Sequence, residues 1–215
     1  MKYHLETRTT ALERVTRRAA DILVAGGALV VLAPLLAIIA LAIRWTSPGP
    51  ALHTQRRVGW QRKPFLFYKF RTMRIGGDDS ALREMIVREL RGEDTSCGGS
   101  FKLDDSRITA VGGFLRRTSL DELPQLINVL RGDMTLVGPR PCLEWEAEMF
   151  PREYDERFDV RPGLTGLWQV SGRSTMGTRD MLRLDIDYVH QRSMGRDIAI
   201  LAQTLPAVLR GDGAR

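Results

Sequence analysis

An uninterrupted run of 22 uncharged residues, from Ile22 to Ile43, constrains the fold of this chain more than any other feature. Asp21 and Arg44 bound the run, and no other stretch of the chain is comparable. As a straight α-helix it would be about 33 Å long, which is enough to cross the hydrocarbon core of a bilayer. We therefore expect this segment to meet lipid, either as a single span or by a path that enters and leaves through one face.

Pro34 lies near the middle of the apolar run and favours a bent path. A proline inside a helix removes one backbone hydrogen bond and clashes with the preceding turn, so the helix is expected to kink or break there. A helix that turns back within the bilayer enters and leaves by the same face. The pattern predicts a re-entrant helix-break-helix over residues 21–46, with Pro34 at the break.

Basic residues flank the apolar run on both sides. Residues 1–20 contain five Lys/Arg and two Glu, and residues 44–77 contain eight Lys/Arg and no acid. Positive charge marks the cytoplasmic side of a membrane segment, which favours a re-entrant path over a single span. A signal peptide is a third alternative, because residues 40–42 have the small-x-small form of a cleavage site. Against it, the run exceeds the ~7–15 residues of a signal core and its leader contains acids.

Length and charge limit the remaining organisation. The 215 residues suffice for one compact domain with attachments, so we expect a basic N-terminal segment (1–20), a re-entrant membrane helix (21–46) and a cytosolic, membrane-associated domain (47–215). The net charge of +6 predicts an anionic partner, which is a nucleic acid, a lipid headgroup surface or a phosphorylated metabolite. Cys97 and Cys142 form no CxxC motif, so neither a disulfide framework nor a zinc site is indicated.

Aromatic and basic residues alternate over Val58–Met73, beyond a turn at residues 47–50 with the sequence SPGP. This alternation predicts a short β-hairpin with its turn at residues 61–64. We favour a hairpin at the membrane interface, with aromatic rings near the headgroups and basic side chains on lipid phosphate. Basic residues interleaved with aromatic ones are also typical of nucleic-acid binding, which is the alternative.

Helical patterns account for much of the remaining chain, so the fold class expected is α+β, mainly α. Residues 76–100 enclose a short amphipathic helix, and two more helices are expected over residues 179–191 and 197–209, with faces that suit a core or a membrane surface. The apolar face of the first consists of Leu82, Met85, Ile86 and Leu90. Residues 161–173 are rich in glycine, which predicts an irregular binding loop.

Residues 114–141 set an adjacent pair of carboxylates, Asp121 and Glu122, among arginines at positions 116, 117, 131 and 140. A carboxylate that attacks phosphorus must approach an anionic group, so cationic side chains, usually with Mg²⁺, have to neutralise the phosphate oxygens. Adjacent side chains point in different directions, so one acid is able to attack while its neighbour holds a metal. The stretch therefore predicts a phosphate site.

A helix-capping box formed by Ser119 and Glu122 is the structural alternative for the acids. Pro124 favours a helix that begins at Pro124 itself, because the residue before a proline avoids helical angles. The acids then lie in the entry turn, where free backbone N–H groups hold an anion. Residues 138–141, Gly-Pro-Arg-Pro, fix the backbone around Arg140 and lower the entropy cost of placing its guanidinium on a phosphate.

Several ordered motifs resemble the bacterial sugar transferases, a family of monotopic polyprenyl-phosphate phosphoglycosyl transferases. The match covers most of residues 20–205 and rests on SPGP, RVG, KPFLFYKFRTM, DDSRITAVGGFLRRTSLDELPQLINVLRGDM, VGPRP and RPGLTGLWQVSGR. The resemblance implies an enzyme at the cytoplasmic face of the inner membrane. It would move a sugar 1-phosphate from a UDP-sugar to polyprenyl (undecaprenyl) phosphate and release UMP, which starts surface glycan or exopolysaccharide assembly. The multi-span region of larger members is not found, so the chain resembles a small catalytic form.

The resemblance also implies roles for individual residues. Asp121 matches the nucleophile that forms a covalent aspartyl phosphosugar, Glu122 matches its Mg²⁺-associated partner, and both are expected metal ligands. Pro34 matches the helix-breaking proline of the family. The expected contacts with substrate phosphate are Arg116, Arg140, Lys69 and Arg71. The expected contacts with the nucleotide are Arg161, Trp168 and Gln169.

Two departures from the family pattern and two competing functions remain. Residues 193–196 lack the large apolar side chains usual in the family, which weakens the expected membrane docking of the C-terminal helices, and Ser106 replaces the usual proline.

A non-enzymatic membrane adaptor that binds anionic lipid or a glycan-assembly partner is the main alternative function. A membrane-tethered nucleic-acid binder is the weaker one, because paired acids oppose it, and we expect no nucleic-acid partner. An oligomer is compatible with the sequence.

Overall fold

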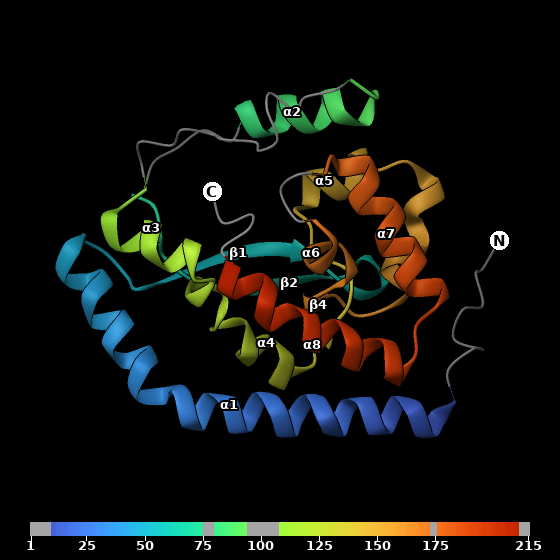
Figure 1. Cartoon of the computed structure of the whole chain (residues 1–215). Helices are drawn as coiled ribbons and strands as arrows, with labels where there is room; N and C mark the ends of the chain where they lie inside the picture. Colours follow the sequence, from blue (N-terminus) through green and yellow to red (C-terminus); the bar gives the residue numbers. More distant parts are fainter. Residues whose placement is uncertain (1–9, 75–79, 94–107, 173–175, 211–215) are drawn as a thin grey trace.

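The computed structural model describes residues 10–74, 80–93, 108–172 and 176–210, and a long helix runs along one side of a compact body (Figure 1). This helix, α1 (Ala11–Thr46), begins with a capping box. Glu13 N–H donates to Thr10 Oγ1 (3.2 Å), and Thr10 N–H donates to Glu13 Oε2 (3.0 Å). These bonds satisfy N–H groups that have no partner inside the helix. α1 therefore begins at Ala11, well before the predicted boundary at residue 21.

α1 is continuous through Pro34 and changes direction along its length (Figure 1). A proline removes one hydrogen bond and pushes the preceding turn away, which bends a helix without having to end it. The predicted break is therefore a bend within one helix, and the re-entrant path through a membrane stays a prediction. The helix ends where Ser47 becomes extended and donates its N–H to the carbonyl of Ile43 (3.1 Å).

After α1, the described chain forms helices, 3-10 turns and four short strands. The 3-10 turns are labelled η. In order they are β1 (Leu52–Val58), η2 (Trp60–Arg62), β2 (Pro64–Phe70), α2 (Ser80–Leu90), α3 (Ala110–Arg117), η3 (Leu120–Glu122), α4 (Gln125–Arg131), β3 (Thr135–Val137), α5 (Glu144–Met149), η4 (Arg152–Asp159), β4 (Gly163–Thr165), α6 (Leu167–Ser171), α7 (Thr178–His190) and α8 (Met194–Arg210). The two predicted C-terminal helices are confirmed as α7 and α8. The mainly helical α+β fold is also confirmed.

β1 and β2 form the predicted antiparallel hairpin, but the turn lies at residues 59–63 rather than 61–64. Gln61 and Arg62 adopt left-handed φ angles of 54° and 56°, which reverse the chain within one 3-10 turn. The first strand therefore begins at Leu52, ahead of the segment in which aromatic and basic residues alternate.

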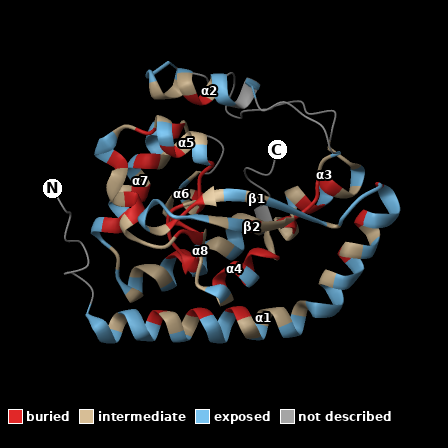
Figure 2. Ribbon diagram, turned by 180° about the vertical axis from the view of Figure 1, so that it is seen from behind, coloured by how far each residue is buried: buried red, intermediate tan, exposed pale blue. Residues whose placement is uncertain are grey.

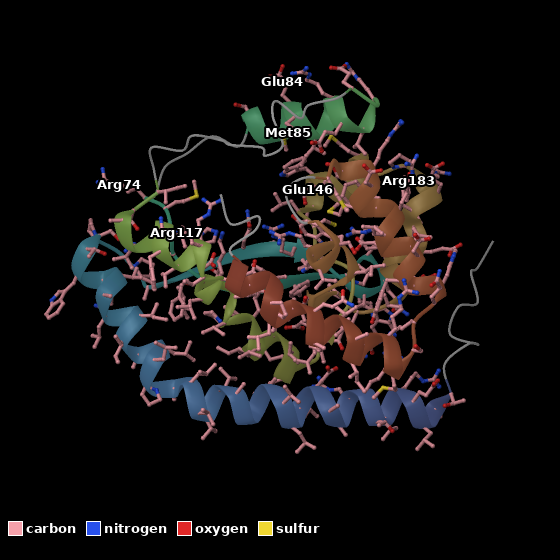
Figure 3. All side chains as sticks on the ribbon, viewed as in Figure 1. Arg74, Glu84, Met85, Arg117, Glu146 and Arg183 are labelled. Atoms are coloured by element: carbon pink, nitrogen blue, oxygen red, sulfur yellow. The ribbon has the colours of Figure 1, made fainter. Side chains whose placement is uncertain are left out.

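α2 confirms the predicted amphipathic helix and lies at the edge of the body beside α7 (Figure 1). Met85 lies on the side of α2 that faces the body, and Glu84 lies on the opposite side (Figure 3). Ile86 is buried and Leu90 is partly buried, as the pattern predicts, whereas the side chain of Leu82 lies outside the described residues.

The glycine-rich segment 161–173 is regular structure where it is described, which corrects the prediction of an irregular loop. It forms β4, which pairs in parallel with β3, and then α6. The two strands approach so closely that a Cβ added at Gly163 would lie 2.0 Å from the backbone nitrogen of Gly138. The glycines thus permit close contact between two backbones.

The two parts of α1 pack against the same body through different clusters. Ala25 is fully buried in the main core with residues of α4, β3 and α7, whereas Ile39 and Ile43 pack with Phe70 of β2 and Leu115 of α3. Burial is therefore confined to one side of α1, and the outer side is exposed along much of its length (Figure 2).

Polar side chains of α1 also join it to the body, near the start of the apolar run. Arg18 donates to the carbonyls of Val129 (2.6 Å) and Leu130 (2.7 Å), which lie in the last turn of α4. The buried carboxylate of Asp21 accepts hydrogen bonds from the Thr135 hydroxyl and from the backbone N–H of Leu136, both in β3. α1 is therefore fixed directly to the strand that leads into residues 138–141.

Candidate active site

The carboxylate pair lies in the 3-10 turn η3, directly before α4. Ser119 has a left-handed backbone (φ 54°) and its side chain makes no capping hydrogen bond, so the capping box is absent and the structural alternative is wrong. α4 begins at Gln125, one residue after the predicted Pro124. Asp121 is 8% exposed and Glu122 is half-buried, which places both acids in the entry turn as predicted.

Asp121 is a buried acid whose pKa is influenced by two cationic side chains. Burial, followed by repulsion from Glu122, raises the pKa of Asp121 from 3.8 to about 6, and the opposing influences are Lys69 and Arg116. Burial also lowers the pKa of Lys69, although Asp121 acts against this. An acid and a base perturbed in opposite directions at one place are typical of functional sites.

Glu122 faces a second cationic group. Arg140 Nη1 lies 3.8 Å from Glu122 Oε1, and the Arg140 guanidinium lies 5.7 Å from the ring centroid of Trp168. A small pocket opens beside Glu122 and Arg140, between the hairpin, η3 and β4. Its polar lining consists of Arg57, Glu122, Gln125, Arg140 and Gln169. The pocket brings together motifs that lie far apart in the sequence.

Asn128 holds the hairpin against the helix that follows the dyad. Its side chain is fully buried, donates to the carbonyl of Leu66 (2.6 Å) and accepts from the backbone N–H of Tyr68 (3.1 Å). Because Asn128 belongs to α4 and the other two to β2, these bonds set the position of Lys69 relative to Asp121. Asn128 was not predicted, although a polar residue inside the apolar stretch LINVL was the available signal.

A buried ion pair supports the backbone at Arg140. Arg157 Nη2 lies 2.7 Å from Asp185 Oδ2 and also donates to the carbonyl of Arg140 (2.8 Å). Neither Arg157 nor Asp185 was predicted, because each stands alone among ordinary charged residues of a helical segment and their pairing is a long-range contact. The pair acts on the site by positioning residue 140.

The structure brings five of the predicted site residues around the dyad and its pocket. These are Lys69, Arg116, Arg140, Trp168 and Gln169.

Arg71 and Arg161 point elsewhere. Arg71 donates to the carbonyls of Ser47 and Pro48, each at 2.7 Å, and so closes the turn after α1. Arg161 donates to the carbonyl of Gly132 (2.9 Å) at the end of α4. Contact of either arginine with substrate stays a prediction that this geometry does not favour.

The dyad offers few ligands for a metal ion. Among the described residues, no three His, Cys, Asp or Glu side chains are grouped so as to hold a metal ion. Asp121 and Glu122 supply two carboxylates from one turn. Mg²⁺ is usually bound by one or two carboxylates together with waters and substrate phosphates, so the donor set fits an ion that arrives with a phosphorylated substrate.

Comparison with known proteins gives a family and several relatives. The family described as bacterial sugar transferase matches residues 12–211. The exopolysaccharide production protein ExoY of Sinorhizobium fredii is 37% identical over 200 residues, which cover 93% of this chain and 88% of that protein. The UDP-glucose:undecaprenyl-phosphate glucose-1-phosphate transferase of Caulobacter vibrioides is 42% identical over 206 residues, which cover 92% of this chain and 71% of that protein.

Longer relatives match over a smaller share of their length. The undecaprenyl-phosphate galactose phosphotransferase of Salmonella typhimurium is 40% identical over 206 residues, which cover 94% of this chain and 42% of that protein. The chain spans 36% to 42% of the length of several such relatives.

Proposed function

The chain belongs to the bacterial sugar transferase family, and from this premise we propose that it transfers a sugar 1-phosphate from a UDP-sugar to polyprenyl phosphate with release of UMP. The observation that carries the proposal is the buried carboxylate of Asp121, which lies beside Glu122 in η3, against the strand β2 that carries Lys69. Relatives named as undecaprenyl-phosphate galactose or glucose phosphotransferases support the substrate class, and relatives named ExoY support a place in exopolysaccharide production.

In the first step, a carboxylate oxygen of Asp121 attacks the phosphorus that carries the sugar. The bond from this phosphorus to the bridging oxygen breaks, and its electron pair leaves with UMP. With a pKa of about 6, Asp121 is largely ionised near pH 7. Lys69 and Arg116 offset the negative charge of the phosphate oxygens, which otherwise repel the carboxylate.

In the second step, an oxygen of polyprenyl phosphate attacks the same phosphorus. The bond between phosphorus and Asp121 breaks, and its electron pair returns to the carboxylate. The product is a polyprenyl diphosphate sugar, and the site is regenerated without a further reactant. The intermediate between the two steps is a covalent aspartyl phosphosugar, whose formation requires an ionised acid and nearby cations that offset the charge of the phosphate.

Mg²⁺ is the proposed cofactor, with Glu122 and Asp121 as its protein ligands. When bound, the ion supplies positive charge next to the phosphate oxygens. Glu122 is half-buried and faces Arg140 at 3.8 Å, so it is open to a ligand that approaches from the pocket.

The proposed location is the cytoplasmic face of the inner membrane, with α1 entering the bilayer and returning. α1 is long and apolar enough to cross a membrane. In its apolar 18-residue stretch, 11% of the residues are buried against the body. Ala25 and Ile43, near opposite ends of the apolar run, both pack against one body, while Val30 and Val31 between them are 76% and 77% exposed. A helix bound to one body at both ends supports the re-entrant path over a full span.

α8 is the second element proposed to lie against lipid. Ile198 and Leu205 are 63% and 65% exposed, and Leu201 between them is 38% exposed. Positions three and four apart share one face of a helix, so these side chains form an apolar stripe. The stripe supports an amphipathic helix at the membrane surface.

Mass spectrometry of the intact protein tests the reaction. The purified chain is incubated with Mg²⁺ and a panel of UDP-sugars without lipid acceptor, beside Asp121→Asn and the surface control Asp180→Asn. We expect a phosphosugar adduct and released UMP with the wild type and with Asp180→Asn, but neither with Asp121→Asn. An adduct of equal yield on Asp121→Asn would contradict its assignment as the nucleophile.

The adaptor function makes the opposite prediction. A protein that only binds anionic lipid or an assembly partner releases no UMP from any UDP-sugar, and its lipid binding is insensitive to Asp121. Absence of both adduct and UMP, with polyprenyl phosphate also supplied, would contradict the transferase and favour the adaptor.

A further inference from the structure

The β-hairpin carries two cationic side chains on one face, at opposite ends. In its antiparallel register Arg57 lies opposite Phe65, and His53 lies opposite Lys69. Because side chains alternate along a strand, all four share a face, and the Arg57 and Lys69 ends are roughly 14 Å apart along β2. Lys69 belongs to the group around Asp121, and Arg57 lies at the other end.

Arg57 is held firmly, and among the described residues its one ion-pair partner is Glu146. Its guanidinium donates to Gln55 Oε1 (2.9 Å) and to the carbonyl of Pro141 (3.3 Å), and it lies 5.3 Å from the ring centroid of Phe67. Its Nη1 lies 4.0 Å from Glu146 Oε2, and the same oxygen accepts the N–H of the N-cap residue of α5 at 2.6 Å. The buried Nε of Arg57 has no hydrogen-bond partner in the described part of the chain.

Arg57 and Arg140 line one pocket, and the charge of its lining is unbalanced. Two guanidinium groups face a single carboxylate, that of Glu122. Burial, and then repulsion from Arg140, lower the pKa of Arg57 to about 10. An anion placed between the two guanidinium groups would remove this repulsion, and a phosphate accepts several of their N–H groups at once. The charge of the pocket lining therefore favours an anion such as a phosphate.

The position of the pocket distinguishes a nucleotide phosphate from a lipid phosphate. Val58, which follows Arg57, packs against residues of α5 and η4. Phe70, which follows Lys69, packs against the C-terminal part of α1. A lipid phosphate is tethered to the bilayer and approaches from the side of α1, whereas a soluble nucleotide has no such tether. The Arg57 end is the one remote from that part of α1.

On the basis of the proposed transferase function, we infer that Arg57 and Arg140 form the subsite for the phosphate of the departing nucleoside monophosphate. When Asp121 bonds to the transferred phosphorus, the electron pair of the broken bond stays on the oxygen of the nucleotide phosphate. The two guanidinium groups neutralise this charge. Gln125 and Gln169 line the same pocket, and their amides are further hydrogen-bonding groups beside this phosphate.

Substitution of Arg57 tests the subsite, with its neighbour as a matched control. Arg56 lies on the opposite face of β1, where its exposed side chain pairs with Glu144 (3.1 Å). UMP binding is measured by calorimetry on the full chain in detergent, without sugar nucleotide or lipid acceptor. Loss of a charged hydrogen-bond donor is expected to weaken UMP binding about 10- to 100-fold in Arg57→Gln, and less than twofold in Arg56→Gln.

Kinetics separate the nucleotide from the lipid phosphate. In Arg57→Gln we expect the KM for UDP-sugar and the inhibition constant of UMP to rise about tenfold or more. The KM for polyprenyl phosphate should stay within about twofold of the wild type. A raised KM for polyprenyl phosphate with unchanged UMP inhibition would overturn the inference and assign Arg57 to the lipid acceptor.

A second variant guards against loss of folding. Arg57→Lys keeps the charge without the planar guanidinium, and we expect UMP binding about three- to tenfold weaker than in the wild type. Wild-type UMP affinity in both variants, with unchanged unfolding midpoints, would overturn the subsite but leave the Asp121 chemistry intact. Because UMP binding needs no turnover, a chain that binds UMP through Arg57 and forms no phosphosugar adduct contradicts the transferase instead.

Discussion

Two groups of buried charge in this molecule have opposite character: the Arg157–Asp185 pair and the Asp121 group at the dyad. Arg157 and Asp185 are 3% and 1% exposed, and Arg157 donates from Nε (3.1 Å) and Nη2 (2.7 Å) to Asp185 Oδ2. Burial alone would lower the pKa of Arg157, but Asp185 raises it above its ordinary value. The charges of this pair are compensated within the protein.

Asp121 is almost as well buried, but its charge is poorly compensated. It is 8% exposed, and no ion pair among the described residues includes it. Burial raises the pKa of Asp185 as well as that of Asp121, so the contrast lies in the partners: Asp185 accepts two hydrogen bonds from Arg157, whereas burial lowers the pKa of Lys69 beside Asp121. The comparison teaches that burial does not distinguish a structural charge from a functional one. The distinguishing feature is whether the counter-charge comes from the protein itself or from a ligand.

Removal of one partner of the compensated pair should have the largest effect on stability. Asp185→Asn leaves the Arg157 guanidinium buried without its counter-charge. We expect a loss of about 3–5 kcal/mol in the free energy of unfolding, measured by denaturant unfolding in detergent. Arg157, which donates to the carbonyl of Arg140, would also be held less firmly, so turnover should fall with stability.

Asp180→Asn on the same helix is the matched control for this change. Asp180 pairs with Arg183 (3.3 Å) at the surface, with side chains 58% and 65% exposed, and such pairs contribute about 0–0.5 kcal/mol. Equal losses in the Asp185 and Asp180 variants would break the comparison.

The uncompensated carboxylate should give an effect of the opposite sign. A pKa raised from 3.8 to about 6 means that folding favours the protonated acid, so the wild type loses stability as pH rises from about 4 to about 6. Asp121→Asn removes this penalty and should be more stable at pH 7.5 by up to about 3 kcal/mol. Its advantage should vanish below about pH 4. A variant less stable than the wild type at pH 7.5 would mean that Asp121 is structural.

Substitution of the two cations of the KFRTM motif, Lys69 and Arg71, should have smaller effects on stability and tests the same comparison. Arg71→Met removes the donors to Ser47 and Pro48 and should lower stability by about 2 kcal/mol. Lys69→Met should leave stability nearly unchanged but lower the rate of adduct formation by more than tenfold. Arg74→Met, at an exposed arginine of the same segment, serves as control for both (Figure 3). Loss of adduct formation in a stable Arg71→Met would restore the predicted phosphate contact.

Local patterns in the sequence predicted much of the fold and the centre of the site. The apolar run and its proline predicted a membrane helix broken at Pro34, which in the structure is one continuous helix, and alternation of residue types predicted the hairpin. Pro124 and the two acids before it predicted a carboxylate pair in an entry turn, whereas Ser119 suggested a capping box that the structure lacks. Each of these depends on residues within a few positions of one another, where backbone preferences act directly.

Long-range contacts account for what was not predicted. The pairing of β3 with β4 joins two strands of three residues, and the glycines that permit it have the composition of a loop. Arg71 and Arg57 both belong to basic motifs, yet one closes a turn and the other lines the pocket. Only the folded arrangement decides which arginine meets protein carbonyls and which meets a ligand.

The attachment of α1 to one body at both ends determines how the protein responds to the thickness of its bilayer. A full span must match the hydrocarbon thickness of its bilayer, and mismatch is met by tilt or by deformation of the lipid. With the proposed re-entrant path, the depth of α1 is fixed by its own packing, and Asp121 keeps a constant height above the lipid surface. The reaction rate should then be independent of the acyl-chain length of lipids in the opposite leaflet.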